Sequence, residues 1–145
     1  MPSWIAARNR GTEVTAETRI LIRQGADIVT ARQQGRLLAA QLRFSSADQT
    51  LIATATSEMA RNILVYAKTG EILLRSEQDG KPGMAIVAHD EGPGIPDIER
   101  ALRDGYSTSG SLGVGLPGTK RIMDEFTIIS EVGKGTTITM KKWKH

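Results

Sequence analysis

The sequence predicts a two-layer α/β sandwich, in which a mixed and largely antiparallel sheet is covered on one face by helices. Stretches with helical spacing of apolar residues occupy much of the first half, and strand-like segments follow them and end the chain. Seven glycines between positions 92 and 118 indicate loops in the region between. A length of 145 residues suits one domain.

The first half is expected to begin with a flexible polar leader, residues 1–17, followed by a single domain over residues 18–145. Apolar and basic residues alternate over Arg19–Arg23, which predicts a half-buried strand. A helix is expected from about Asp27 to Leu42, and a second one from a capping serine, Ser45 or Ser46, to about Ala67. The inner side of the first helix is expected to carry Ile28, Ala31, Leu38 and Leu42.

The second half is expected to supply four strands and two short helices. Gly70–Glu77 and Met84–Asp90 are apolar enough for strands, and Lys81-Pro82-Gly83 between them indicates a turn. Short helices are expected over Pro96–Arg103 and Gly115–Glu125. The last two strands are expected on either side of a hairpin turn at Gly133-Lys134-Gly135, over Phe126–Val132 and Thr136–Trp143.

Composition excludes several classes of protein. The absence of cysteine removes disulfide frameworks and thiolate metal sites, and no apolar run approaches the roughly eighteen residues of a membrane span. The net charge of +3 is spread along the chain, and six aromatic residues (two each of Trp, Tyr and Phe) are few for a nucleic-acid surface. We therefore expect a cytoplasmic protein with neither membrane nor nucleic-acid partners.

Two polar residues, Glu58 and Asn62, fall on the apolar side of the second long helix. They are four residues apart, so their side chains are neighbours on one face, and burying them without partners would be costly. A cleft that binds a divalent cation would explain both. Asn62 could offer its carbonyl oxygen to Mg²⁺, and Glu58 could position or deprotonate an attacking hydroxyl. The helix by itself equally allows Glu58 to pair with Arg61 at an exposed edge.

A second motif, Asp90-Glu91-Gly92-Pro93-Gly94, follows a buried strand. A carboxylate at this place can accept a hydrogen bond from an exocyclic amine such as that of adenine. Gly92 and Gly94 allow the backbone to approach a flat ligand closely. A tight structural turn would have the same pattern, so the motif alone leaves both interpretations open.

A third motif, containing Gly113, Gly115 and Gly118, opens a helix and follows a serine-rich stretch. Helix N-termini bind phosphate through free N–H groups, and the polar stretch ahead has the character of a lid. The glycine spacing is no dinucleotide fingerprint, because it does not follow a strand, and the order Gly118-Thr119-Lys120 does not fit the Walker motif. The His-Arg-Asp and Asp-Phe-Gly motifs of ordinary protein kinases are absent.

The order of the three motifs resembles that of the ATP-binding (Bergerat) superfamily of gyrase, Hsp90, histidine kinases and MutL. By this resemblance Asn62 would hold magnesium and Glu58 would be the catalytic base. Asp90 would meet adenine, and Thr136 would support its recognition through water. The implied nucleotide site consists of Asn62, Asp90, Gly92, Gly94, Gly113, Gly115, Gly118 and Thr136.

Within this superfamily, the segments SEMARNILVYA, DEGPGIPDIERALRDGYSTSGSLGVGLPGTKRIMDEF and EVGKGTTI resemble the RsbT-type switch-protein serine kinases of the bacterial stressosome. The resemblance extends from about Thr18 to the end of the chain. It implies that ATP and Mg²⁺ are used to phosphorylate STAS-domain scaffold and antagonist proteins. It also implies that the released kinase binds and activates a PP2C-type phosphatase in a general stress response. The related anti-sigma-factor kinases share the site, but the lid sequence is closer to that of the switch kinases.

Two classes of function are thus open, a serine/threonine-protein kinase and a regulatory module that docks to a phosphatase or sigma factor when nucleotide sets its shape. A dinucleotide-binding fragment is a weaker third alternative. His89 lies within a predicted strand and is expected to be structural, which disfavours a histidine kinase.

Overall fold

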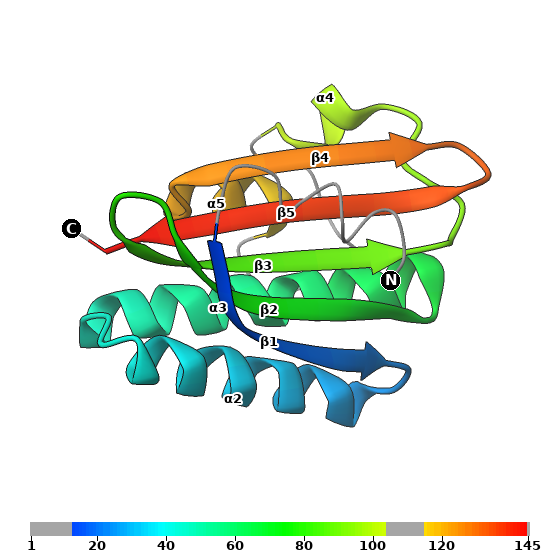
Figure 1. The fold of residues 1–145 in the computed structure, drawn as a ribbon. Coiled ribbons are helices and arrows are strands. Elements are labelled where there is room, and N and C mark those ends of the chain that lie inside the picture. The colour runs from blue at the N-terminus through cyan, green and yellow to red at the C-terminus, as the bar shows by residue number, and fades with distance from the viewer. Residues whose placement is uncertain (1–12, 104–114, 145) are drawn as a thin grey trace.

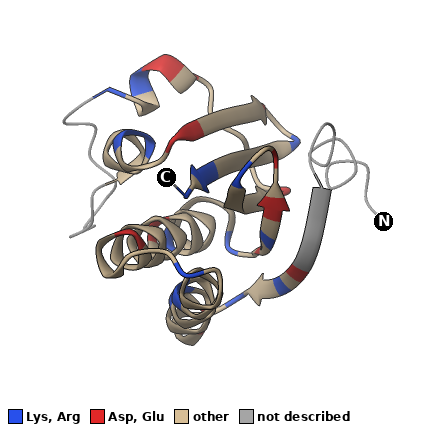
Figure 2. Ribbon diagram, turned by 60° about the vertical axis from the view of Figure 1, so that its left-hand side comes forward, with Lys and Arg blue, Asp and Glu red and all other residues tan. Residues whose placement is uncertain are grey.

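The structure is a computed structural model that describes residues 13–103 and 115–144, with side chains from residue 17 onward. Five strands form one sheet in the order β1-β2-β3-β5-β4, and helices cover one of its faces (Figure 1). The strands are β1 (Glu13–Ile22), β2 (Gly70–Gln78), β3 (Pro82–Asp90), β4 (Glu125–Glu131) and β5 (Gly135–Trp143). The helices are α2 (Gly25–Gln41), α3 (Ser46–Asn62), the π-helix η1 (Ile63–Ala67), α4 (Ile98–Ala101) and α5 (Gly115–Ile122). Figure 2 looks almost along the two long helices and separates helices and sheet into two layers, which confirms the predicted α/β sandwich.

All four strand pairings are antiparallel, so the sheet of the described residues is not mixed as predicted. The reason is the placement of the last hairpin. The connection through α4 and α5 leads the chain to β4 at the sheet edge, and β5 then returns between β4 and β3. β4 runs in the same direction as β3, and because the hairpin reverses the chain direction, β5 between them is antiparallel to both.

The first strand is longer than its apolar pattern indicates. β1 begins at Glu13 rather than at Arg19, inside the segment that the sequence predicts to be a flexible leader. Its pairing runs from Glu13 opposite Gln78 to Ile22 opposite Gly70. The hydrogen bonds of a ladder join main-chain groups, so the polar residues at the start of β1 can pair with β2 without any alternation of apolar side chains.

The two long helices pack on each other and on the sheet. Ser45 caps α3 by accepting a hydrogen bond of 3.1 Å from the backbone N–H of Asp48, as predicted. Ala31 of α2 is fully buried, and the other predicted inner residues pack against the same core: Ile28, Leu38 and Leu42. A Cβ atom on Gly35 would lie 2.8 Å from Thr56 Oγ1 of α3, so the two helices approach each other closely at a position where α2 has no side chain. Among the described residues, no helix has the length and apolar character to cross a membrane.

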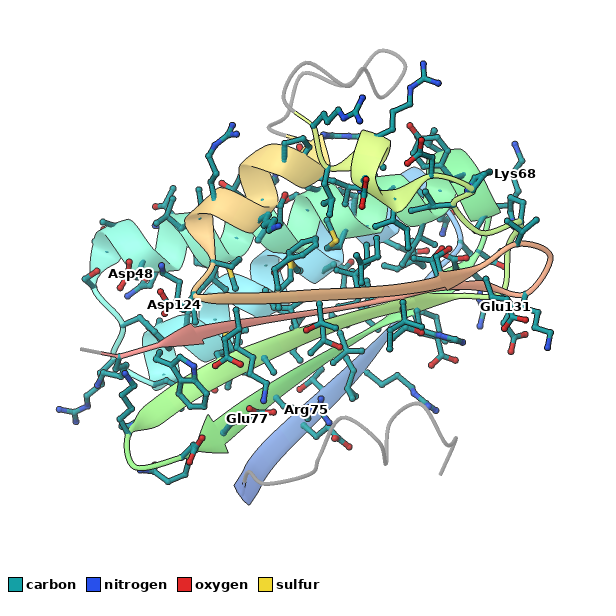
Figure 3. The ribbon with its side chains drawn as sticks, turned by 90° about the horizontal axis from the view of Figure 1, so that it is seen from above. Asp48, Lys68, Arg75, Glu77, Asp124 and Glu131 are labelled. Carbon is teal, nitrogen blue, oxygen red and sulfur yellow. The ribbon has the colours of Figure 1, made fainter. Side chains whose placement is uncertain are left out.

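The sheet face turned away from the helices has a smaller apolar cluster of Leu73 and Val87. Arg75 and Glu77 also lie on this side (Figure 3), and both of their side chains are fully buried. Lys141 Nζ lies 2.9 Å from Glu77 Oε2.

Lys142 is expected to hold the far end of α5 in place. Its buried ammonium donates a 2.9 Å hydrogen bond to the carbonyl of Ile122, the last residue of α5. Asp124 and Asp48, which lie together in Figure 3, are 3.9 and 4.0 Å from the same ammonium. Replacing Lys142 by Met is expected to lower the free energy of unfolding by roughly 2 kcal/mol, because a charge-assisted hydrogen bond is lost inside the protein. Urea titration followed by circular dichroism measures this change.

The matched control is Lys134→Met, since Lys134 pairs with Glu131 in a bridge whose side chains are 73% and 66% exposed. This variant should change stability by less than about 0.5 kcal/mol. Equal losses in both variants would contradict a specific role of Lys142.

Candidate functional site

The first part of the site is the C-terminal end of α3, where Glu58 and Asn62 lie one turn apart. Glu58 is 3% exposed, and Asn62 is partly buried as the last residue of the α-helix. The α-helix ends there, and the residues up to Ala67, predicted to continue it, form the π-helix η1. π-Helical turns are rare and are frequently found at functional sites. Tyr66 of η1 lines the cleft that Asn62 faces.

The alternative interpretation of Glu58, a pair with Arg61 at an exposed edge, is correct only in part. Its Oε1 accepts a 2.9 Å hydrogen bond from Arg61 Nη1, so the predicted alternative pair exists. Glu58 is nevertheless buried and does not lie at an exposed edge. Its second oxygen, Oε2, is buried and has no hydrogen-bond partner among the described residues. Arg61 thus holds one oxygen of the carboxylate, and the other oxygen has no hydrogen bond within the described part of the chain.

Asn62 has a similar unsatisfied group. Its Nδ2 is buried without a hydrogen-bond partner in the described part of the chain. The nitrogen and oxygen of a carboxamide exchange places by a rotation of the terminal group, so either atom can face the cleft. No group of three or more His, Cys, Asp or Glu residues able to hold a metal exists among the described residues. The carboxamide of Asn62 fits a cation that takes one carbonyl oxygen from the protein and the rest of its ligands from phosphate and water.

The second part of the site is Asp90, the last residue of β3. Its Oδ1 accepts a 2.9 Å hydrogen bond from the N–H of Gly92, which folds the following loop into a tight turn. Burial raises the pKa of Asp90 above its usual 3.8, and the N–H groups of Gly92 and Thr136 and the nearby His89 oppose this shift only in part. An ionised Asp90 is therefore short of hydrogen-bond donors, which a ligand amine can supply.

Glycine is required at two positions that join this turn to the last hairpin. Gly94 has φ +79°, and a Cβ there would lie 2.4 Å from the carbonyl oxygen of Glu131. Gly135 has φ +128°, and its Cβ would lie 2.1 Å from the carbonyl oxygen of Asp90. A side chain at either position would collide with backbone. The loop after β3 therefore packs directly against the β4–β5 turn. A structural role of its glycines is compatible with the ligand-binding role that the sequence suggests.

These parts meet in one cleft that is open to solvent. The predicted residues that line it are Asn62, Asp90, Gly94 and Thr136. Its other lining residues, none of which was predicted from the sequence, are Tyr66, Pro93, Ile95, Ala101, Leu116 and Ile138. Most of these are apolar. Pro93 and Leu116 lie within the second and third motifs, but a motif does not show which of its apolar residues face a cleft.

The remaining predicted residues lie close to the cleft without lining it, or outside the described residues. Gly92 packs against Ala67, since a Cβ there would lie 2.6 Å from the Cβ of Ala67. Gly115, with φ +67°, starts α5, and its carbonyl accepts a 2.7 Å hydrogen bond from Thr119 Oγ1. Gly118 is buried within the same helix. Gly113 and the serine-rich lid lie outside the described residues, and their predicted role stays a prediction.

His89 Nδ1 lies 2.7 Å from Thr137 Oγ1. The two residues are opposite each other in the β3–β5 pairing. Neither lines the cleft, which agrees with the structural role expected for His89.

Comparison with known proteins gives consistent results. A family model described as the histidine kinase-like ATPase domain matches residues 23–142. The serine/threonine-protein kinase RsbT of Bacillus subtilis is 55% identical over 118 residues, which are 81% of this chain and 89% of that protein. An anti-sigma F factor of Geobacillus stearothermophilus is 35% identical over 111 residues, 71% of this chain and 75% of that protein.

Two solved structures have the same fold. The RsbU and RsbW domains of a Mycobacterium tuberculosis protein match with a TM-score of 0.56 at 20% identity, over 88% of this chain and 32% of that one. The mycobacterial sensor histidine kinase MprB matches with a TM-score of 0.52 at 14% identity, over 88% of this chain and 97% of that one.

Proposed function

This chain belongs to the histidine kinase-like ATPase domain family and to its RsbT-type serine/threonine-protein kinases, and from this premise we propose that it transfers the γ-phosphate of ATP to a serine or threonine of a partner in a sigma-factor pathway. The observation that carries this proposal is the meeting of Asn62, Asp90 and Thr136 in one cleft. The three residues come from α3, β3 and β5. Asp90 and Thr136 have polar groups suited to the base, and Asn62 has one suited to the phosphate end.

The adenine end of the cleft is proposed to lie at Asp90. Its carboxylate would accept a hydrogen bond from the exocyclic amine, with Thr136 beside it across the β3–β5 pairing. Ile95, Leu116 and Ile138 give the cleft the apolar walls that a flat base requires. Because Gly94 has no side chain, its backbone can lie close to the base at the cleft wall.

The phosphate end is proposed to lie at Asn62, one turn from Glu58. A magnesium ion held through the Asn62 carboxamide would neutralise phosphate charge there. Glu58 would orient the acceptor hydroxyl through its free Oε2 while Arg61 holds Oε1. The hydroxyl oxygen forms the new bond to the γ-phosphorus, the bond to the bridging oxygen of ADP breaks, and the hydroxyl proton passes to Glu58.

The proposed partners are STAS-domain scaffold and antagonist proteins of a cytoplasmic stressosome and, after release, a PP2C-type phosphatase. The identity of 55% to a serine/threonine-protein kinase RsbT supports this pathway. The similarity to an anti-sigma F factor favours a second candidate, an anti-sigma-factor kinase that binds a sigma factor directly.

Incubation of the full chain with Mg²⁺, γ-labelled ATP and candidate STAS-domain proteins tests the proposal. Acid-stable label on a serine or threonine of a STAS protein is the expected result. A nucleotide-dependent complex without label would instead favour the regulatory binding module, and capture of a sigma factor would favour the anti-sigma-factor kinase. Binding of NAD in preference to ATP would reject both kinase assignments.

Asn62→Ala is expected to weaken binding of ATP in the presence of Mg²⁺ by about 10- to 100-fold, because a ligand to the cation is lost. Binding of adenosine, which has no phosphates, should change little. Stability without ligand should also change little, because Nδ2 has no partner to lose among the described residues. Calorimetry with and without EDTA separates these effects. An equal loss for adenosine and ATP would show that Asn62 shapes the cleft rather than holding the cation.

A further inference from the structure

Ser130, on β4, joins three segments around the nucleotide cleft without lining the cleft itself. Its Oγ accepts a 2.7 Å hydrogen bond from the backbone N–H of Ile95. The same oxygen lies 3.2 Å from the carbonyl oxygen of Gly135 and 2.8 Å from Thr136 Oγ1. One partly buried hydroxyl therefore contacts the loop after β3 and the first two residues of β5.

The chemistry of a hydroxyl decides the direction of each of these bonds. Ser130 has one proton to donate and two lone pairs to accept with. The N–H of Ile95 can only donate, and the carbonyl of Gly135 can only accept. Ser130 must therefore give its proton to Gly135, and the contact with Thr136 must use the proton of Thr136. This is the one assignment in which all three contacts are hydrogen bonds.

The consequence for the cleft is that Thr136 presents lone pairs to it and no proton. Asp90, its partner in the β3–β5 pairing, also accepts hydrogen bonds when it is ionised. A ligand group that meets these two residues directly must donate. A water that donates one hydrogen to each of them keeps only lone pairs for the ligand, so the ligand must donate in this case as well.

We propose that Ser130 is a specificity-determining positioning residue, which directs the proton of Thr136 away from the cleft and so favours a purine with an amine at C6 over one with a carbonyl. The inference rests on the proposed function, because it assumes that the cleft takes the base of ATP. It adds a residue outside the cleft that sets which purine is accepted.

The test compares ATP with ITP, whose base carries a carbonyl in place of the C6 amine. The wild-type chain should prefer ATP. In Ser130→Ala the hydroxyl proton of Thr136 loses its acceptor. It can then turn toward the cleft and donate a hydrogen bond to the C6 carbonyl of ITP. The ratio of the two dissociation constants is therefore expected to move toward one by about tenfold, the effect of roughly one hydrogen bond. Ser130→Thr keeps a hydroxyl and should retain the wild-type ratio.

The ratio distinguishes this role from a structural one. If Ser130→Ala weakens ATP and ITP equally, Ser130 only supports the loop and the inference is overturned. If the wild-type chain binds ATP and ITP alike, the inference fails while the proposed function stands. If the wild-type chain binds neither, the proposed function fails, and the inference with it. Should Ser130→Ala not fold, Ser130→Cys keeps a similar volume with a weaker donor and acceptor, and the same loss of preference is expected to a smaller extent.

Discussion

Glu58→Gln is expected to reduce phosphoryl transfer by about 10²- to 10⁴-fold, the usual contribution of a general base, while ATP affinity stays within about twofold of the wild type. The amide has the shape of the carboxylate but cannot take the proton of the acceptor hydroxyl. In the proposed arrangement Glu58 contacts the acceptor hydroxyl and not the nucleotide, so the change should leave nucleotide binding nearly unaltered. Transfer to a STAS-domain protein and calorimetric ATP binding give the two quantities.

A matched control is Glu99→Gln, which neutralises an exposed glutamate of α4 and should leave both quantities unchanged. Arg61→Gln is informative in a second way. It removes the group that holds Glu58 Oε1 but keeps the base, so it should reduce transfer less than Glu58→Gln does. Transfer by Glu58→Gln at the wild-type rate would exclude Glu58 as the base.

Asp90→Asn is expected to weaken ATP binding by about 10- to 100-fold, since a hydrogen bond to an ionised acceptor is replaced by a neutral one. Asn can still accept the N–H of Gly92 through its oxygen, so the turn should persist. Asp79→Asn changes an exposed carboxylate in the β2–β3 turn and serves as the control. Unchanged affinity of Asp90→Asn would remove Asp90 from the base-binding end.

The shifted pKa of Asp90 adds a pH dependence to this prediction. Burial raises the pKa above 3.8, so ATP affinity should fall as the pH is lowered through the raised folded-state pKa, where the acceptor becomes protonated. Asp90→Asn should abolish this fall. Loss of affinity with the same pH profile in the variant would assign the titration to another group.

The effect on stability has the opposite sign. A raised folded-state pKa contributes stability below 3.8, and this contribution is lost as the pH rises through the folded-state pKa. Ionisation of Asp90 in the folded protein therefore costs stability, and the unliganded Asp90→Asn variant should unfold at a temperature no lower than the wild type. Thermal unfolding at about pH 7 measures this. A clearly lower temperature would indicate that the carboxylate is needed for the turn itself.

The sequence alone was sufficient for the features that depend on neighbouring residues. Helical spacing located α2 and α3, and the polar pair Glu58 and Asn62 on an apolar helix face indicated a cleft. The glycines of the last turn predicted the β4–β5 hairpin, but not that Gly135 lies so close to the carbonyl of Asp90 that a side chain would collide with it. The resemblance of the ordered motifs led to the family that the comparisons show.

Only the tertiary structure decided how distant segments meet. It placed β5 between β3 and β4, and so put Thr136 opposite Asp90 and within reach of Ser130. It also paired Glu58 with Arg61 while burying Glu58. Periodicity in a sequence records which side of an element is apolar, whereas strand order and the partners of a hydroxyl depend on contacts between residues far apart in the chain. This is why Asn62 and Asp90 could be proposed from their motifs, while Ser130 and the apolar wall of the cleft could not.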